Sequence, residues 1–177
     1  MVEKENQKIW TTKVKTEEAF LRKKARSFDF DGYSKKEINN LVLFMRTLMV
    51  KNLGVGLAAP QIGLNLRVFV AQLPADDSHG YKGKFYAVFN PETVSISKKL
   101  SPEEEGCLST PGYYGAVPRA DKITVSGFDK NGRKKTIKAE GFLARIFQHE
   151  IDHLNGILFL DKSKNIRKLE KNLNENE

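Results

Sequence analysis

The sequence predicts an α+β fold in which mostly antiparallel strands and hairpins pack around a central helix. Three observations carry this prediction. A helical pattern with a polar cap covers residues 34–51. Short runs rich in β-branched and aromatic residues follow between residues 67 and 139. Apolar residues at helical spacing then return over residues 142–154, which places a helix after the strands.

Length and composition indicate one globular domain over residues 1–177. A chain of 177 residues can bury a real core, and its 40% hydrophobic and 29% charged content is ordinary for a soluble protein. No apolar run is long enough to cross a bilayer, and the N-terminus lacks the apolar segment of a signal peptide. One cysteine permits no intrachain disulfide, so we expect a reducing cytoplasm and no membrane partner.

The formal net charge of +8 has two interpretations. It reflects either a solvated surface with excess lysine or attraction to an anionic partner such as ribosomal RNA. The lysines are scattered and no basic motif interleaved with aromatic residues is present, which favours the solvated surface.

The N-terminal part is expected to hold a mobile segment, 1–14, and then an amphipathic helix. Ser34-Lys35-Lys36-Glu37 has the form of a capping box, and the helix it opens runs to about Lys51. The apolar residues of this helix form one stripe typical of a face packed on the core: Ile38, Leu41, Val42, Met45, Leu48 and Met49.

The middle of the chain is predicted to be strands, and the end a helix. The expected elements are strands at 67–73, 85–89 and 93–97, a polar loop at 76–84, and a hairpin formed by 122–128 and 134–139. Asn90-Pro91 predicts the end of the second strand, and Asn131-Gly132 predicts the hairpin turn. Ile166, Leu169 and Leu173 predict a short amphipathic helix in a C-terminal tail, 162–177.

A glycine-rich stretch at residues 54–61 is expected to be an irregular turn. Its first six letters fit the G-x-G-x-x-A dinucleotide fingerprint, but that fingerprint follows a strand and opens a helix. Here the stretch follows a helix, and Pro60 would interrupt the next one. We therefore expect no dinucleotide, and exposed backbone that pairs with an extended peptide instead.

The helix at 142–154 contains an H-E-x-x-H pattern. His149 and His153 lie four residues apart, so both imidazoles share one helix face and can coordinate one metal ion. Glu150 can reach a water in the open position of that metal. Asn155-Gly156 predicts the end of the helix. The pattern indicates a central metal-binding helix, but a catalytic metal normally has three protein ligands.

Three sources of a third ligand remain open from the residues alone. The remaining histidine, His79, lies in a polar loop and is expected to be exposed. An acidic residue is the second source. Cys107 is the third; a lone cysteine is more often a small buried apolar residue. However, Gly106 before it allows a close approach of the backbone, and the flanking acids are unusual around a core position. A thiolate with two imidazoles is also a three-ligand set that leaves one position open for water.

Three stretches are similar to the three motifs of the peptide deformylase family, in that family's order and at compatible spacing: residues 54–61, 105–109 and 148–153. The resemblance extends from about Phe20 to Asp161. H-E-x-x-H alone is shared with many metalloproteases, but the three motifs together are highly specific. Two departures affect the pocket rim and the peptide contacts: Thr110 replaces an aliphatic residue, and Tyr114 stands where some members have arginine.

The resemblance implies a bacterial-type, metal-dependent hydrolase that removes the N-formyl group from the formylmethionine of nascent polypeptides and releases formate. One divalent metal per chain would be expected, with Fe²⁺ as the native ion and Zn²⁺, Ni²⁺ or Co²⁺ also accepted. The implied metal ligands are Cys107, His149 and His153. The implied catalytic residues are Glu150 as base and acid, with the Gln61 amide and the Leu108 N–H on the formyl oxygen. The implied substrate contacts are Gly56, Val55 and Gly106.

Two further carboxylates have weaker roles. Glu105 and Arg119 form either a pair that orients the cysteine loop or an ordinary surface ion pair. Asp152 is expected to be a structural carboxylate and not a metal ligand.

Two alternative functions stay open. One is a metallopeptidase that uses the same helix and needs no formyl group. The other is a ribosome- or RNA-binding module with a structural metal, which requires a fourth ligand that the sequence does not evidently offer. The basic C-terminal helix, with lysines over residues 162–171, is either a solvated face or a ribosome-docking surface, as such a tail is in some relatives.

Overall fold

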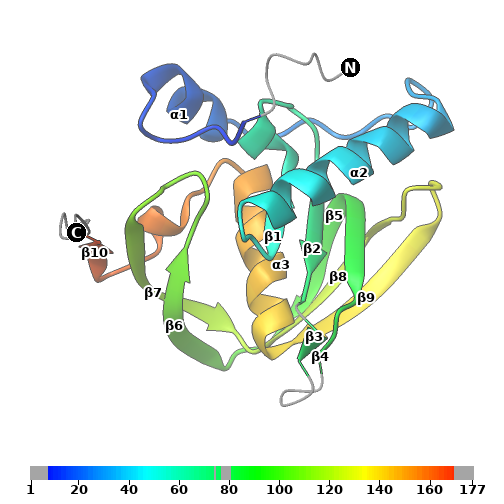
Figure 1. The fold of residues 1–177 in the computed structure, drawn as a ribbon. Coiled ribbons are helices and arrows are strands. Elements are labelled where there is room, and N and C mark those ends of the chain that lie inside the picture. Colours follow the sequence, from blue (N-terminus) through cyan, green and yellow to red (C-terminus); the bar gives the residue numbers. More distant parts are fainter. Residues whose placement is uncertain (1–7, 74, 77–80, 170–177) are drawn as a thin grey trace.

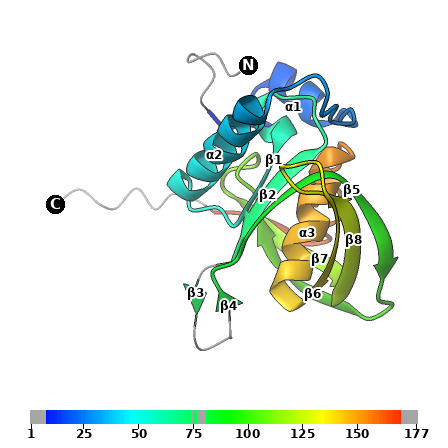
Figure 2. The ribbon, with the colours of Figure 1, turned by 90° about the vertical axis from the view of Figure 1, so that its right-hand side faces the viewer.

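The computed structural model describes residues 8–73, 75–76 and 81–169. Helix α3 lies at the centre, between a five-stranded sheet and a three-stranded sheet, and helix α2 covers the opposite face of the larger sheet (Figure 1, Figure 2). The larger sheet has the order β1-β2-β5-β8-β9 and the smaller one β10-β7-β6, and the pairings between named strands in both are antiparallel. This arrangement confirms the predicted α+β class.

Over the described residues, helices, short 3₁₀ turns and strands follow one another along the chain. They are α1 Lys15–Leu21, α2 Lys35–Lys51, β1 Gly56–Ala58, η2 Ala59–Ile62, β2 Val68–Gln72, β3 Ala75–Asp76, β4 Tyr81–Lys82, β5 Phe85–Ile96, β6 Leu100–Gly106, β7 Tyr113–Ala120, β8 Lys122–Phe128, β9 Lys134–Glu140, α3 Gly141–Leu154, η3 Phe159–Asp161 and β10 Ile166–Lys168.

The larger sheet separates two hydrophobic cores because the side chains of β2 alternate between its faces. Phe69 and Ala71 pack toward α3, while Val68 and Val70 pack toward α2. All four are fully buried. The sheet is therefore covered on both faces, and α3 is held in a fixed position against it.

The predicted caps of both long helices are confirmed. Ser34 and Glu37 form the reciprocal capping box at the start of α2, with the Ser34 N–H donating to the Glu37 carboxylate at 2.8 Å. Asn155 caps the C-terminal end of α3, and Gly156 follows with φ +74°. A Cβ at Gly156 would collide with the carbonyl of Arg22, so only glycine fits there.

The hairpin of β8 and β9 is also confirmed. The Asp129 carboxylate accepts the backbone N–H groups of Asn131 and Arg133 at 2.8 and 3.0 Å, and Gly132 takes φ +74°. These contacts close the turn that the Asn-Gly pair predicts.

Strand β5 does not end at Asn90-Pro91, and residues 93–97 do not form a separate strand. Asn90 adopts φ +47°, and the pairing of β5 with β8 shifts between Phe89 and Glu92. This irregularity admits the proline without ending the sheet. The side chain of Asn90 bonds both backbone groups of Phe28, which holds the bend in place.

The remaining local predictions need correction at four places. The stretch 54–61 is not an irregular turn, because β1 and η2 form there, and the loop at 76–84 includes strand residues of β3 and β4. In addition, no strand was predicted at the positions of β6 and β7. Strand β6 has little apolar alternation, since most of its residues are exposed, so no period-2 signal marks it. Strand β6 is held by its backbone pairing with β7, whose residues are more buried.

The two chain ends differ from expectation as well. Residues 8–14, expected to be mobile, are hydrogen-bonded to the rest of the domain. The N–H of Trp10 donates to Gln61 O at 2.7 Å, and the N–H of Thr12 donates to Ser109 O at 2.9 Å. Residues 166–168 form strand β10 on β7 and not a helix. Leu173 and the rest of 170–177 lie outside the described residues. Across the part of the chain that the structure describes, no helix is long and apolar enough to span a membrane.

Candidate metal centre

The structure brings the lone cysteine together with the two histidines of α3. Cys107 directly follows β6, and one donor atom each from Cys107, His149 and His153 lie within 4.8 Å of one another. The Cys107 Sγ and the His153 Nε2 are 3.1 Å apart. Of the three sources considered for a third ligand, Cys107 is therefore the one in place. His79 lies outside the described residues.

The electrostatics of this group favour metal-binding forms. Burial alone would raise the pKa of the Cys107 thiol, but the imidazoles of His153 and His149 hold it well below its ordinary value. A thiolate is the ligand form of cysteine. Burial opposes a charged His149, while Cys107 and Glu105 raise its pKa well above the ordinary value. A metal ion would displace that proton.

These donors fit a divalent transition metal. A thiolate and two imidazoles suit iron, zinc, nickel or cobalt, and three protein ligands leave a position open for chemistry. Among the described residues, three side chains offer a ligand atom to this site, and no fourth one joins them. A closed structural site would need four, so the geometry corresponds to a catalytic centre.

Glu105 on β6 orients the first histidine. The Nδ1 of His149 lies 2.9 Å from the Glu105 carboxylate, which can only accept, so Nδ1 carries the proton. The other ring nitrogen, Nε2, is then left as a ligand. Although burial opposes its charge, His149 and Arg119 hold the pKa of Glu105 far below its ordinary value, so it stays ionised.

Glu105 and Arg119 form a buried pair, so the interpretation as a surface ion pair is wrong. The guanidinium donates two hydrogen bonds of 2.9 Å to the two carboxylate oxygens, and the two side chains are 3% and 5% exposed. Arg119 also contacts Asp152, which accepts from Lys162 at 2.7 Å. Asp152 lies outside the ligand group, as expected for a structural carboxylate.

Sequence reasoning missed Arg145, a buried cation on α3. It donates to Glu105 at 2.7 Å, to the carbonyl of Val117 at 2.9 Å and to the carbonyl of Ser101 at 2.6 Å. It thereby ties α3 to β6 and β7 of the smaller sheet. A signal was available, because Arg145 precedes His149 by one helical turn and shares its face.

Gln61 is held rigidly next to the sulfur. Its side chain is 2% exposed, and its carbonyl accepts the N–H of Ala58 at 2.8 Å. The amide nitrogen is consequently directed toward Ser109 Oγ at 3.1 Å and Cys107 Sγ at 3.6 Å. A buried amide donor is thus fixed beside the group of Cys107, His149 and His153.

Glu150 is a buried carboxylate that faces Gly56. Burial raises its pKa to about 7, with the two imidazoles opposing that rise. One carboxylate oxygen has no hydrogen-bond partner among the described residues. The other lies so close to Gly56 that a Cβ there would collide with it. The glycine therefore makes the room that this carboxylate occupies.

A cavity of about 790 Å³ opens beside these residues and is lined by Val55, Gly56, Gly106, Cys107, Leu108, Tyr114, His149 and Glu150 among others. The carbonyl of Val55, the residue before β1, accepts the N–H of Gln72 in β2. Because backbone groups alternate along a strand, Gly56 directs its own N–H and carbonyl away from β2. In the part of the chain that the structure describes, β1 thus presents an unpaired edge to the cavity.

Comparison with known proteins agrees with this geometry. The family model described as polypeptide deformylase matches residues 11–169. A peptide deformylase from Symbiobacterium thermophilum is 46% identical over 154 residues, which cover 87% of this chain and 67% of the relative.

Solved structures show the same fold. The peptide deformylase of Thermus thermophilus superposes with a TM-score of 0.73 at 41% identity, covering 87% of this chain and 83% of that one. A class I type b enzyme from Acinetobacter baumannii, bound to Met-Ala-Ser, superposes with a TM-score of 0.78 at 31% identity over 87% and 96% of the two chains. The chain belongs to the peptide deformylase family, metal-dependent hydrolases that remove the N-formyl group from nascent peptides.

Proposed function

We propose that the deformylase reaction takes place in the cavity beside Cys107 and that its substrate is the formylmethionyl end of a new polypeptide. The single observation that carries this assignment is the convergence of three ligand donors within 4.8 Å, next to Glu150 on the same helix turn. The products are formate and a free amino terminus. The Acinetobacter baumannii relative with bound Met-Ala-Ser supports a peptide with an N-terminal methionine at this place.

Cys107, His149 and His153 are the proposed metal ligands. A divalent ion held there supplies a Lewis acid and a water of lowered pKa. Fe²⁺ is the proposed native ion, and Zn²⁺, Ni²⁺ and Co²⁺ fit the same donors. Glu105, Arg119 and Arg145 keep His149 in the orientation that this ligand set needs.

Glu150 is the proposed general base and acid. A carboxyl group whose pKa is about 7 both accepts and returns a proton near neutral pH. It takes a proton from the attacking water and delivers one to the leaving amine, which could not depart as an anion. Its place beside Gly56 in the lining of the cavity supports this role.

Gln61 and Leu108 are the proposed donors to the formyl oxygen, which becomes negative as water adds. The Gln61 amide is already oriented by Ala58 before substrate arrives, so no reorganisation is needed during the reaction. Leu108 follows the proposed ligand Cys107 and lines the cavity, which supports a role for its backbone N–H at the same oxygen.

The substrate backbone is proposed to pair with the free edge of β1 and with the end of β6. The carbonyl of Gly56 accepts the N–H of the formyl amide. Val55 precedes β1, and its carbonyl accepts the N–H of Gln72 within the sheet, while its N–H is proposed to pair with the peptide. Gly106 pairs from the opposite side, where its lack of a Cβ leaves room for the ring of Tyr114.

Formate release from formyl-Met-Ala tests the assignment. The wild-type chain, purified without air, is expected to release formate, while Cys107→Ser loses bound metal and Glu150→Gln keeps metal but loses activity. Metal content is measured by elemental analysis of the same samples. Cleavage of unformylated Met-Ala-Ser without formate release would support the metallopeptidase alternative and reject this proposal.

Two expectations remain predictions. One is a cytoplasmic catalytic domain that comprises the whole chain. The other is docking on the ribosome through basic residues after Asp161, of which 166–168 are a strand and not a helix. Salt-sensitive co-sedimentation of the wild type and of Lys164→Glu with ribosomes tests the docking; equal sedimentation of the two would count against it.

A further inference from the structure

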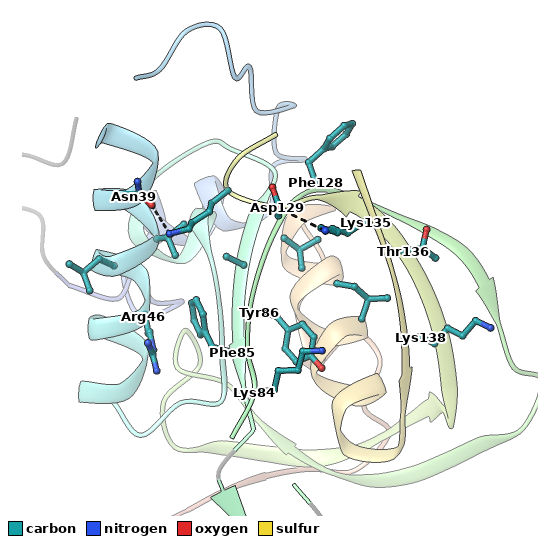
Figure 3. A pocket seen from close by; sticks show the side chains of 16 residues that line it. Asn39, Arg46, Lys84, Phe85, Tyr86, Phe128, Asp129, Lys135, Thr136 and Lys138 are labelled. Atoms are coloured by element: carbon teal, nitrogen blue, oxygen red, sulfur yellow. Dashed lines mark hydrogen bonds and ion pairs between the residues drawn. The ribbon is translucent and has the colours of Figure 1, made fainter. Parts of the chain in front are cut away.

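A second cleft lies on the side of α2, away from the metal centre. Its volume is about 770 Å³, and none of its lining residues lines the metal-centre cavity. Figure 3 shows α2 with Asn39 and Arg46 on one side, and β5 with Phe85 and Tyr86, preceded by Lys84, in the middle. The β8–β9 hairpin lies on the other side. None of the residues assigned to the reaction lines this cleft.

One edge of β5 is unpaired along this cleft. Strand β5 pairs with β2 over Phe85–Phe89, but its pairing with β8 begins only at Phe89. Among the described residues, no strand therefore lies beside the outer edge of 85–88. Such an edge is a template for an additional strand.

The register identifies which backbone groups point outward. Asn90 donates its N–H to Arg67 O, beside β2, and the pairing from Phe89 back to Phe85 is regular. Because backbone groups alternate in an antiparallel pair, Val88 and Tyr86 also face β2. Phe85 and Ala87 then direct their N–H and C=O groups into the cleft.

The walls of the cleft are basic around an apolar floor. Among the described residues, one carboxylate lines the cleft, that of Asp129, which lies 4.0 Å from Lys135. Five cations line it there: Arg46, Lys84, Lys130, Lys135 and Lys138. The floor consists of Val42, Phe85, Tyr86, Phe128 and Ile137. The guanidinium of Arg46 lies over the Phe85 ring at 4.6 Å and the ammonium of Lys84 over the Tyr86 ring at 5.1 Å.

We propose that this cleft binds an extended acidic peptide segment of another protein, which adds a strand to the free edge of β5. The backbone groups of Phe85 and Ala87 pair with the peptide, its apolar side chains rest on the floor, and its carboxylates meet the lysines. The charge of the rim selects the partner. A second copy of this chain would bring the same cations face to face, which disfavours edge-to-edge dimers.

The probe is a blocked peptide in which valine and glutamate alternate over about seven residues, a usual strand length. It carries a fluorophore for anisotropy and no formyl group, so the metal centre does not process it. A matched peptide with N-methyl groups on alternate residues cannot pair as a strand. Binding of the first peptide, weakened by salt, and failure of the second are the expected results.

Amide hydrogen exchange of the full-length, metal-loaded protein locates the bound strand. In the free protein the amides of Phe85 and Ala87 are expected to exchange faster than those of Tyr86 and Val88. The peptide should slow exchange at Phe85 and Ala87 specifically. Unchanged exchange at these two amides would overturn the proposal.

Charge reversal supplies the second test. Lys84→Glu with Lys138→Glu is expected to weaken peptide binding at least about tenfold, because two attractive contacts become repulsive. Lys36→Glu with Lys98→Glu makes the same change in net charge outside the cleft and should alter binding less than about twofold. Formate release from formyl-Met-Ala should stay at the wild-type rate in both variants, which reports that they are folded.

Three results would contradict the proposal. The first is equal weakening by the two charge-reversed variants, which would indicate a general charge effect. The second is tighter binding of an oligouridylate than of the acidic peptide at the same residues, which would assign the cleft to nucleic acid. The third is concentration-dependent dimerisation of the free protein that protects the Phe85 and Ala87 amides.

Discussion

Replacing Glu105 by glutamine is expected to weaken both the fold and the metal site. Glu105 and Asp152 are two buried negative charges that balance two buried positive charges, Arg119 and Arg145. The amide of Glu105→Gln occupies nearly the same volume but leaves one buried positive charge without its counter-ion. Breaking a buried pair in this way costs about 3–5 kcal/mol.

That cost is a large part of the total stability of a typical domain, about 5–15 kcal/mol. For a chain of this length each kcal/mol lowers Tm by about 2–4 °C, so Tm should fall by about 6–20 °C. The second effect is on the metal. His149 loses a charged acceptor at Nδ1, for which the expected loss of metal affinity is about 10- to 100-fold.

Glu103→Gln is the matched control, two residues earlier on the same strand. Glu103 also contacts Arg145, at 3.2 Å, but its side chain is 60% exposed, so its loss should cost at most about 1 kcal/mol. Thermal unfolding of metal-free protein and competition with a chelating dye measure the two effects. If Glu105→Gln and Glu103→Gln had equal Tm and equal metal affinity, the balance of buried charges would not be what stabilises the fold and the metal site.

Three further predictions concern single residues. Gly56→Ala should displace the Glu150 carboxylate and lower kcat by at least about 100-fold while bound metal stays unchanged in elemental analysis; a normal kcat would refute the close packing. Gln61→Leu should lower kcat by about 100- to 1,000-fold with KM little altered, and a change confined to KM would argue against a donor to the formyl oxygen. The bond from Lys8 and that from the N–H of Thr11 hold the pKa of Glu17 below its ordinary 4.5, so its stabilising effect is present above pH 4.5 and is lost as the pH falls through the lowered value. The Tm difference between the wild type and Glu17→Gln, measured by calorimetry, should accordingly be present at pH 7 and vanish in strong acid; a difference independent of pH would contradict this.

The parts of the fold that were predictable are those whose signals are local. The capping box at Ser34 and Glu37 and the Asn131-Gly132 turn each satisfy backbone groups within a few residues, so their sequence is enough. Strands β6 and β7 carry no such signal. Strand β6 is mostly exposed, and its place is set by pairing with β7 and by the buried side chains of Glu105 and Arg119.

Predictions were wrong where a contact between distant residues overrides the local sequence pattern. Pro91 usually ends a strand, yet β5 continues because the neighbouring Asn90 is held by Phe28, a residue far away in the chain. The helical spacing of Ile166 and Leu169 is overridden by pairing of β10 with β7. Trp10 is fixed by Gln61 and by the ring of Phe20, which no property of residues 8–14 indicates.

By itself the sequence determined the histidine pair, because a spacing of four residues places both rings on one face of any helix. It also determined which side chains are available for metal binding and proton transfer, since the three motifs together specify the ligand types and the base. The tertiary structure decided that Cys107, 46 positions before His153, completes the group, and that Glu105, Arg119 and Arg145 support it from within. Periodicity is a property of neighbouring residues, whereas contact between distant ones depends on how the sheets and α3 pack, and no local pattern encodes that packing.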